Sequence, residues 1–180
     1  LEIQKAIELG MDELCFTEHS DYDVPTVVNC DYDAYFKEME EMKEKYKGQI
    51  TLKTGIEFGI QVHTTKAYEE TFGQYPFDFV IFSCHQVENK EYWRQEPQKG
   101  KTQLEYNRRY YQEILDVVKA YKDYSILGHL DVIKRYDLNG EIKLEKIKDL
   151  IEQIFEVVIA DGKGIELNTS SRAYHLKSLM

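Results

Sequence analysis

The sequence predicts an α/β fold with a parallel sheet, because short apolar segments of strand character alternate with longer segments of helical periodicity. Residues 77–82 form an apolar run interrupted only by Asp78, as expected of a strand that is buried on both faces. Residues 104–121 instead carry apolar side chains at positions 104, 111, 114, 115 and 118, a helical spacing. Strand followed by helix, repeated with short links, is the pattern of a parallel sheet with crossover helices.

The individual elements follow from this periodicity and from the residues that end it. Strands are expected at residues 13–17, 50–60, 77–82, 125–130 and 165–168. Helices are expected at residues 1–9, 35–46, 66–71, 104–121 and 144–160. Asp31 or Asp33 would cap the second helix, and Gly10, Gly48 and Gly162 would each follow a helix end. Residues 86–101 form a long polar segment between the third strand and its helix.

Length and composition restrict the class of protein. The chain has 180 residues, which suits one domain with a sizeable core. It carries 23 Lys+Arg against 33 Asp+Glu, a formal net charge of −10, and this balance argues against nucleic acid as a partner. No apolar run approaches the ~20 residues of a membrane span. Three cysteines without a CxxC pair favour a reducing compartment, so we expect a cytoplasmic protein without a membrane partner.

Side chains of metal-ligand type stand at the ends of successive predicted strands. His19 follows the first strand, Glu57 lies in the second, His85 follows the third and His129 lies at the end of the fourth. In a parallel α/β barrel these carboxyl ends share one face, where active sites are built. Imidazole nitrogen and carboxylate oxygen are ligands of zinc, iron and manganese. One such histidine alone is more often a hydrogen-bonded rim residue, but four strands in succession favour a metal site.

Other reactive side chains have plainer interpretations. His63 lies in a polar loop, which favours a solvated surface role, and the pattern assigns no role to His175. Cys84 beside His85 invites a thiol-nucleophile interpretation, but its apolar strand favours a buried, inert cysteine. The tyrosine-rich residues 106–111 are better explained by a packed helix face than by stacking on bases, because the chain is acidic.

Two arginines follow the last two predicted strands. Arg135 comes six residues after His129, and Arg172 closes the run Asn-Thr-Ser-Ser-Arg after the fifth strand. Guanidinium groups bind phosphate through paired hydrogen bonds, so arginines beside a metal site indicate a phosphoester substrate. For either arginine alone, a surface ion pair is the simpler explanation.

Four short motifs resemble, in their order and spacing, those of the PHP domain. They are Phe-Thr-Glu-His at 16–19, Gly-Ile-Glu-Phe-Gly at 55–59, Ser-Cys-His at 83–85 and Gly-His-Leu-Asp at 128–131. The run Gly-His-Leu-Asp-Val-Ile-Lys-Arg-Tyr and the later run Ile-Glu-Leu-Asn-Thr-Ser-Ser-Arg are similar to the histidinol-phosphatase branch. The resemblance covers nearly the whole chain, and the set is specific although each motif alone is weak.

The resemblance implies a distorted (β/α)7 barrel with a cluster of up to three divalent metal ions, zinc, manganese or iron, at the strand carboxyl ends. The implied metal ligands are His19, Glu57, His85 and His129. Arg135 and Arg172 match the positions that hold the substrate phosphate. Asp131 is expected to orient His129 or a loop without touching the metal.

The resemblance is incomplete at both ends. The first strand of the family carries a His-x-His motif and its last strand an Asp-x-His motif, and neither occurs here. Because Leu1 stands mid-helix and the chain stops soon after the fifth predicted strand, we expect residues 1–180 to be a fragment of a single PHP domain. It would hold about five of the seven β/α units.

The activity implied by the resemblance is metal-dependent hydrolysis of a phosphomonoester, here L-histidinol phosphate, to L-histidinol and phosphate in histidine biosynthesis. A metal-activated water would attack phosphorus, so no side-chain nucleophile is expected. Two alternatives stay open: another substrate such as a phosphotyrosine or nucleotide ester, and a non-catalytic PHP-derived binding module. An amidohydrolase-like reaction is disfavoured because no lysine that could bridge two metal ions in modified form stands at a predicted strand end. The PHP part of a DNA polymerase is disfavoured by the acidic charge. The sequence leaves the oligomeric state open.

Overall fold

The computed structural model describes residues 1–170 and 173–174 of the 180-residue chain. Its central element is a five-stranded sheet with the order β1-β2-β3-β6-β7, and all neighbouring strands run parallel. The strands are β1 (Glu13–Ser20), β2 (Thr51–Gly59), β3 (Phe79–Ser83), β6 (Ile126–Leu127) and β7 (Gly164–Ile165). The predicted α/β class is confirmed, and within the described residues the sheet stays open and does not close into a barrel.

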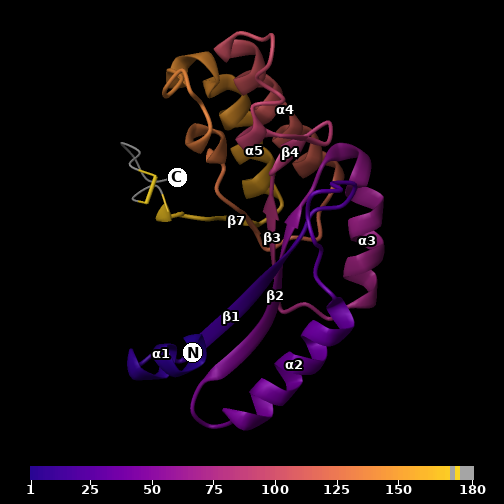
Figure 1. Cartoon of the computed structure of the whole chain (residues 1–180), viewed down its shortest axis with the longest axis vertical. Helices are drawn as coiled ribbons and strands as arrows, with labels where there is room; N and C mark the ends of the chain where they lie inside the picture. Colours follow the sequence, from indigo (N-terminus) through magenta and orange to yellow (C-terminus); the bar gives the residue numbers. More distant parts are fainter. Residues whose placement is uncertain (171–172, 175–180) are drawn as a thin grey trace.

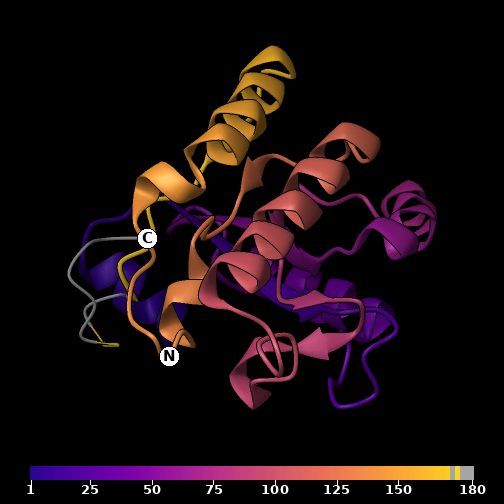
Figure 2. The same cartoon turned by 90° about the horizontal axis from the view of Figure 1, so that it is seen from above.

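Helices connect the strands, as expected of parallel crossovers. The helices are α1 (Glu2–Glu8), α2 (Tyr32–Lys45), α3 (Thr65–Gln74), α4 (Gln103–Ala120) and α5 (Lys148–Ala160). Shorter 3₁₀ turns are η1 (Val62–Thr64), η2 (Tyr92–Arg94), η3 (Val132–Arg135) and η4 (Leu144–Lys146). In Figure 1, α2 and α3 lie along one side of β1 and β2, and Figure 2 shows α4 and α5 side by side. None of these described helices is long and apolar enough to cross a membrane.

Two groups of buried apolar side chains hold the helices against the sheet. The larger group includes Phe58 of β2, Phe82 of β3 and Ile114 of α4, each at most 1% exposed. The smaller group joins α1 and α2 to the amino-terminal half of the sheet through residues such as Met39 and Leu52. Full burial of side chains of this size contributes about 1.5–3 kcal/mol each, which makes this packing the main source of stability. This packing holds the carboxyl ends of the strands in fixed positions.

Local signals set the helix ends. Asp31, not Asp33, caps α2: its side chain accepts a hydrogen bond from Ala34 N at 3.1 Å. At the start of α4, Thr102 and Glu105 form a reciprocal capping box. This cap fixes where the polar segment 86–101 ends and the packed helix begins.

Several predicted boundaries are wrong in an informative way. The first strand runs on to Ser20, so His19 lies within β1 and not beyond it. The fourth and fifth strands are only two residues long, shorter than predicted, so His129 lies beyond β6. The predicted helix at 144–160 is interrupted, since η4 ends before Ile147 and α5 begins after it. The polar segment also contains a small antiparallel hairpin, β4 (Gln86–Val87) with β5 (Lys90–Glu91).

Candidate metal centre

Strand register brings the first two candidate ligands together. β1 and β2 pair so that His19 stands directly opposite Glu57. Directly opposite residues in neighbouring strands project to the same face of a sheet. One strand further along, Gly59 stands opposite Ser83, and His85 follows two residues later. The parallel sheet thus places these side chains together at the carboxyl ends of its strands, as the sequence predicts.

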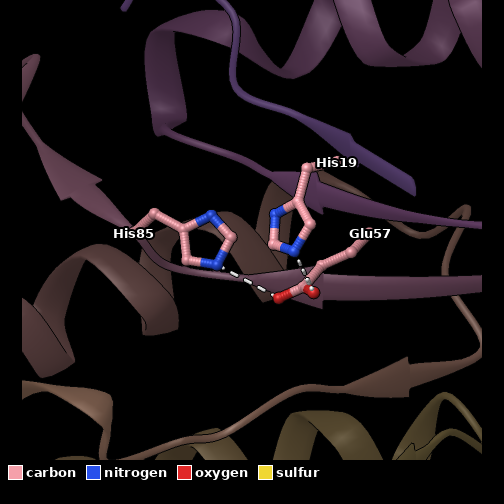
Figure 3. Close-up of side chains that lie close together, drawn as sticks. All are labelled: His19, Glu57 and His85. Atoms are coloured by element: carbon pink, nitrogen blue, oxygen red, sulfur yellow. Dashed lines mark hydrogen bonds and ion pairs between the residues drawn. The ribbon is translucent and has the colours of Figure 1, made fainter. Parts of the chain in front are cut away.

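Three imidazoles converge on the Glu57 carboxylate. His19 Nε2 lies 3.1 Å from Oε2 of Glu57, and His85 Nε2 lies 3.1 Å from Oε1 (Figure 3). His129 Nε2 lies 3.2 Å from the same Oε1. The rings of His19 and His85 stack with centroids 5.3 Å apart, and the His85 and His129 centroids are also 5.3 Å apart. The structure therefore brings together all four residues that the strand-end pattern selects.

Contacts of the two residues that follow β6 place His129. The backbone N–H of His129 donates to Glu166 Oε2 at 2.7 Å. The preceding residue, Gly128, lies so close to β3 that a Cβ there would stand 2.4 Å from Ser83 Oγ. Only glycine fits such an approach. The close approach of Gly128 to β3 and the bond to Glu166 thus hold His129 just beyond the carboxyl end of β6.

Asp21 is a fifth member of the cluster, and the sequence reasoning missed it. Its Oδ1 lies 2.7 Å from His85 Nδ1, and its Oδ2 lies 4.0 Å from His19 Nδ1. The Asp21 side chain is only 4% exposed. A signal was available: Asp21 comes two residues after His19 and therefore continues the same face of the extended chain. The aspartate has no metal-binding motif of its own, so that spacing was the only indication.

Burial and hydrogen bonding act against each other on the charges of this cluster. Burial would raise the pKa of Glu57, but hydrogen bonds from His129, His19 and His85 outweigh it and hold that pKa far below its usual value. The hydrogen bond to Glu57 raises the pKa of His19. Burial would lower the pKa of His85, but its bonds to Asp21 and Glu57 raise that pKa to about 10. Glu57 therefore carries a negative charge that a bound cation would offset.

The donor set fits a divalent ion. In tetrahedral zinc sites with bonds of about 2.0–2.1 Å, ligand atoms lie about 3.3 Å apart. The three Nε2–Oε distances of 3.1–3.2 Å are close to that value. Ligand atoms of His19, Glu57 and His85 all lie within 4.8 Å of one another. His129 also has a buried Nδ1 without a partner among the described residues, so only its Nε2 is engaged.

The cluster lines one end of a cavity of about 510 Å³, and Arg135 lines the same cavity. Arg135 ends η3, and it donates through Nη2 to Ser170 Oγ at 2.6 Å. Its guanidinium also stacks on the Tyr174 ring, 5.0 Å from the centroid. Trp93, 44% exposed, forms another part of the wall. The cavity thus combines nitrogen and oxygen donors, one fixed guanidinium and an aromatic surface.

The remaining candidates differ in outcome. The Asp131 carboxylate lies 2.5 Å from Lys134 Nζ and braces η3 through this ion pair. Arg172 and His175 lie outside the described residues.

His63 is half exposed and bonds Asn89 through Nε2 at 3.0 Å, in line with the surface role expected for it. Cys84 is 2% exposed, and burial raises its thiol pKa well above the usual value, which favours the inert cysteine.

Known proteins share this sequence pattern. The chain is similar to the histidinol-phosphatase of Lactococcus lactis, with 32% identity over 171 residues, covering 93% of this chain and 64% of that protein. It is similar to a probable histidinol-phosphatase of Clostridium acetobutylicum at 26% identity, covering 94% of this chain and 67% of that protein. The chain therefore spans about two thirds of the length of these relatives.

Solved structures share the fold. The crystal structure of histidinol phosphate phosphatase from Lactococcus lactis, complexed with zinc, L-histidinol and phosphate, matches with a TM-score of 0.86 and 32% identity. The match covers 93% of this chain and 65% of that one. A putative histidinol phosphatase from Listeria monocytogenes matches in fold alone, with a TM-score of 0.69 and 18% identity, over 97% of this chain and 77% of that one. The PHP domain model matches residues 2–170, a range that contains all five clustered residues, and the chain accordingly belongs to the PHP domain family.

Proposed function

We propose that this chain provides the metal centre and part of the substrate pocket of a phosphomonoester hydrolase that acts on L-histidinol phosphate. The observation that carries the proposal is the convergence of three imidazole Nε2 atoms on one carboxylate, in the cavity that also contains Arg135. The relative at 32% identity is a histidinol-phosphatase, and the matching crystal structure holds zinc, L-histidinol and phosphate.

The proposed metal ligands are His19, Glu57, His85 and His129. Bound divalent ions would supply Lewis acidity, which lowers the pKa of water and offsets charge on the phosphate oxygens. We include zinc, manganese and iron as candidate ions, since nitrogen and oxygen donors suit all three.

The chain's own residues would bind and orient the substrate. Arg135 is held by Ser170 and Tyr174, so its guanidinium is already positioned to pair with phosphate oxygens. Arg172 is proposed as a second phosphate-binding residue on the strength of its motif. Trp93 and Tyr136, with ring centroids 6.2 Å apart, offer an apolar wall to the organic part of the ester. Asp131 would act indirectly, by bracing the 3₁₀ turn that carries Arg135.

The first test is phosphate release from L-histidinol phosphate by the complete gene product. Zinc or manganese is added in one series and a chelator in another, and a His129→Ala variant is compared with a His63→Ala control. His63 is a matched control because its imidazole bonds Asn89 outside the cavity. We expect metal-dependent release that His129→Ala loses and His63→Ala keeps.

Two other outcomes would replace the proposal. Metal-dependent release from phosphotyrosine or a nucleotide ester, without release from L-histidinol phosphate, would keep the chemistry and change the substrate. Absence of both metal binding and release would favour a non-catalytic binding module. We also propose a cytoplasmic protein without a membrane partner, based on its three cysteines without a CxxC pair and its lack of a long apolar run, and without a nucleic-acid partner, based on the net charge of −10.

A further inference from the structure

Asp21 occupies a position from which it controls one ring of the cluster. His85 lies between two carboxylates, with Nδ1 2.7 Å from Asp21 and Nε2 3.1 Å from Glu57. An ionised carboxylate only accepts hydrogen bonds, so a hydrogen bond to Asp21 places a proton on His85 Nδ1. A neutral imidazole protonated on Nδ1 carries its lone pair on Nε2, the atom that faces Glu57 and the other imidazoles.

The surroundings hold Asp21 rigidly in that position. Its backbone N–H donates to Asn29 Oδ1 at 2.7 Å. On either side, Tyr68 Oη donates to Ser20 O at 2.9 Å and accepts from Tyr22 N–H at 2.9 Å. The side chain itself is 4% exposed, so little of the Asp21 carboxylate is accessible to water. An aspartate fixed by both flanking residues keeps its carboxylate aimed at one partner.

Gly59 is the residue that makes room for this pair. A Cβ at position 59 would stand 1.9 Å from Asp21 Oδ1 and 2.8 Å from His85 Nδ1. Both distances are shorter than any tolerated contact, and the atoms concerned are the two that form the hydrogen bond. A substitution at position 59 can therefore disturb the Asp21–His85 contact independently, without changing the charge of Asp21.

We infer that Asp21 is a positioning residue that keeps His85 protonated on Nδ1, so that His85 Nε2 is presented to the metal ion. The inference rests on the proposed function for the ion, but the Asp21–His85 contact can be measured without one. Hydrogen-bonded partners behind metal-bound histidines typically change metal affinity by 10–100-fold when they are removed.

The test compares two variants with two matched controls in the complete gene product. Asp21→Asn removes the acceptor charge, and Gly59→Ala displaces the carboxylate. Asp78→Asn is the first control, because Asp78 Oδ2 accepts from Thr54 N at 2.8 Å at the opposite end of the sheet. Gly73→Ala is the second, because a Cβ there meets nothing within 4 Å.

Two readouts separate positioning from folding. Zinc affinity, measured by competition with a chelator, should fall 10–100-fold in Asp21→Asn and in Gly59→Ala and stay unchanged in both controls. In ¹⁵N-histidine spectra, the His85 Nδ1–H, assigned with a His85→Gln variant, should exchange slowly with water in the wild type. That proton should exchange fast in both test variants, with or without zinc.

The outcomes distinguish this inference from the proposed function. A wild-type His85 Nδ1–H that exchanges fast, or wild-type zinc affinity in both test variants, overturns the role of Asp21. Should Asp21→Asn fail to fold, the wild-type exchange rate and Gly59→Ala still decide. A wild type that binds no divalent ion contradicts the proposed metal centre, whereas slow His85 Nδ1–H exchange in that same protein would still support the positioning of the ring.

Discussion

The hydroxyl of Tyr68 joins the ends of β1 and β2, and its removal should destabilise the protein strongly. Tyr68 is fully buried, and its Oη lies 2.9 Å from Ser20 O and 3.0 Å from Gly59 O. The same oxygen accepts from Tyr22 N–H at 2.9 Å. One hydroxyl therefore bonds three backbone groups. Ser20 and Tyr22 flank Asp21 in the sequence, and Gly59 comes two residues after Glu57 in β2.

The size of the effect follows from the groups left behind. Tyr68→Phe keeps the ring packing and removes the oxygen, which leaves the Tyr22 N–H without its acceptor and both carbonyls without this donor. A stranded buried polar group costs about 1–3 kcal/mol. With a smaller loss at the carbonyls, we expect the free energy of unfolding to fall by about 3 kcal/mol. For a chain of this length, that corresponds to a melting temperature lower by about 6–12 °C.

Urea unfolding followed by circular dichroism measures this change, with Tyr110→Phe as the matched control. Tyr110 is equally buried, but its Oη has no hydrogen-bond partner among the described residues. Removing that hydroxyl should be neutral or slightly stabilising, because it strands nothing. Equal destabilisation by the two variants would refute the reasoning, since it would mean that the hydroxyl bonds of Tyr68 contribute nothing.

Four further predictions concern the cavity and the Cys30 thiol. Arg135→Lys should raise KM for the phosphoester about tenfold with little loss of stability, because lysine cannot form the paired contact; an unchanged KM in steady-state assays would contradict this. Trp93→Ala should lower kcat/KM for L-histidinol phosphate about 2–10-fold but spare a small alkyl phosphate, as the ratio of the two rates would reveal. Burial, with Glu18 and Asp31 nearby, raises the pKa of Cys30 to about 11, so its alkylation by iodoacetamide should lag behind free cysteine until the pH approaches 11. Because the unfolded thiol has a pKa near 9.0, the contribution of Cys30 to stability should be complete below pH 9 and lost as the pH rises to 11.

The long strands could be predicted because buried and exposed side chains alternate over enough residues to be recognised. In β2, Leu52, Ile56 and Phe58 are buried while Glu57 faces the site, and such alternation is legible in the sequence. In β6 only Ile126 and Leu127 pair with the neighbouring strands. The apolar run around them extends further than the strand does. The close approach of Gly128 to Ser83, 45 residues away in the sequence, has no local pattern that would predict it.

The candidate site was predictable where a ligand lies at a strand end and obscure where it acts through another residue. His19, Glu57, His85 and His129 each sit at or near such an end, so strand order alone predicted their convergence. Asp21 acts only through His85, from which 64 residues separate it along the chain. That partnership depends on strand pairing and on the gap left by a glycine, and both are properties of the folded sheet.

Hydrogen bonds from two glutamine amides fasten the aromatic part of the cavity wall. The Gln95 amide donates to Tyr136 O at 2.7 Å and to Tyr92 O at 3.2 Å, which ties two segments far apart in the sequence. Gln98 adds a bond to Tyr92 O at 3.1 Å. Amide–carbonyl bonds carry no net charge, so titration of the cluster does not act on them directly, whereas each imidazole–carboxylate contact depends on where the protons lie. The aromatic part of the wall is thus fastened by bonds of a kind that does not depend on pH.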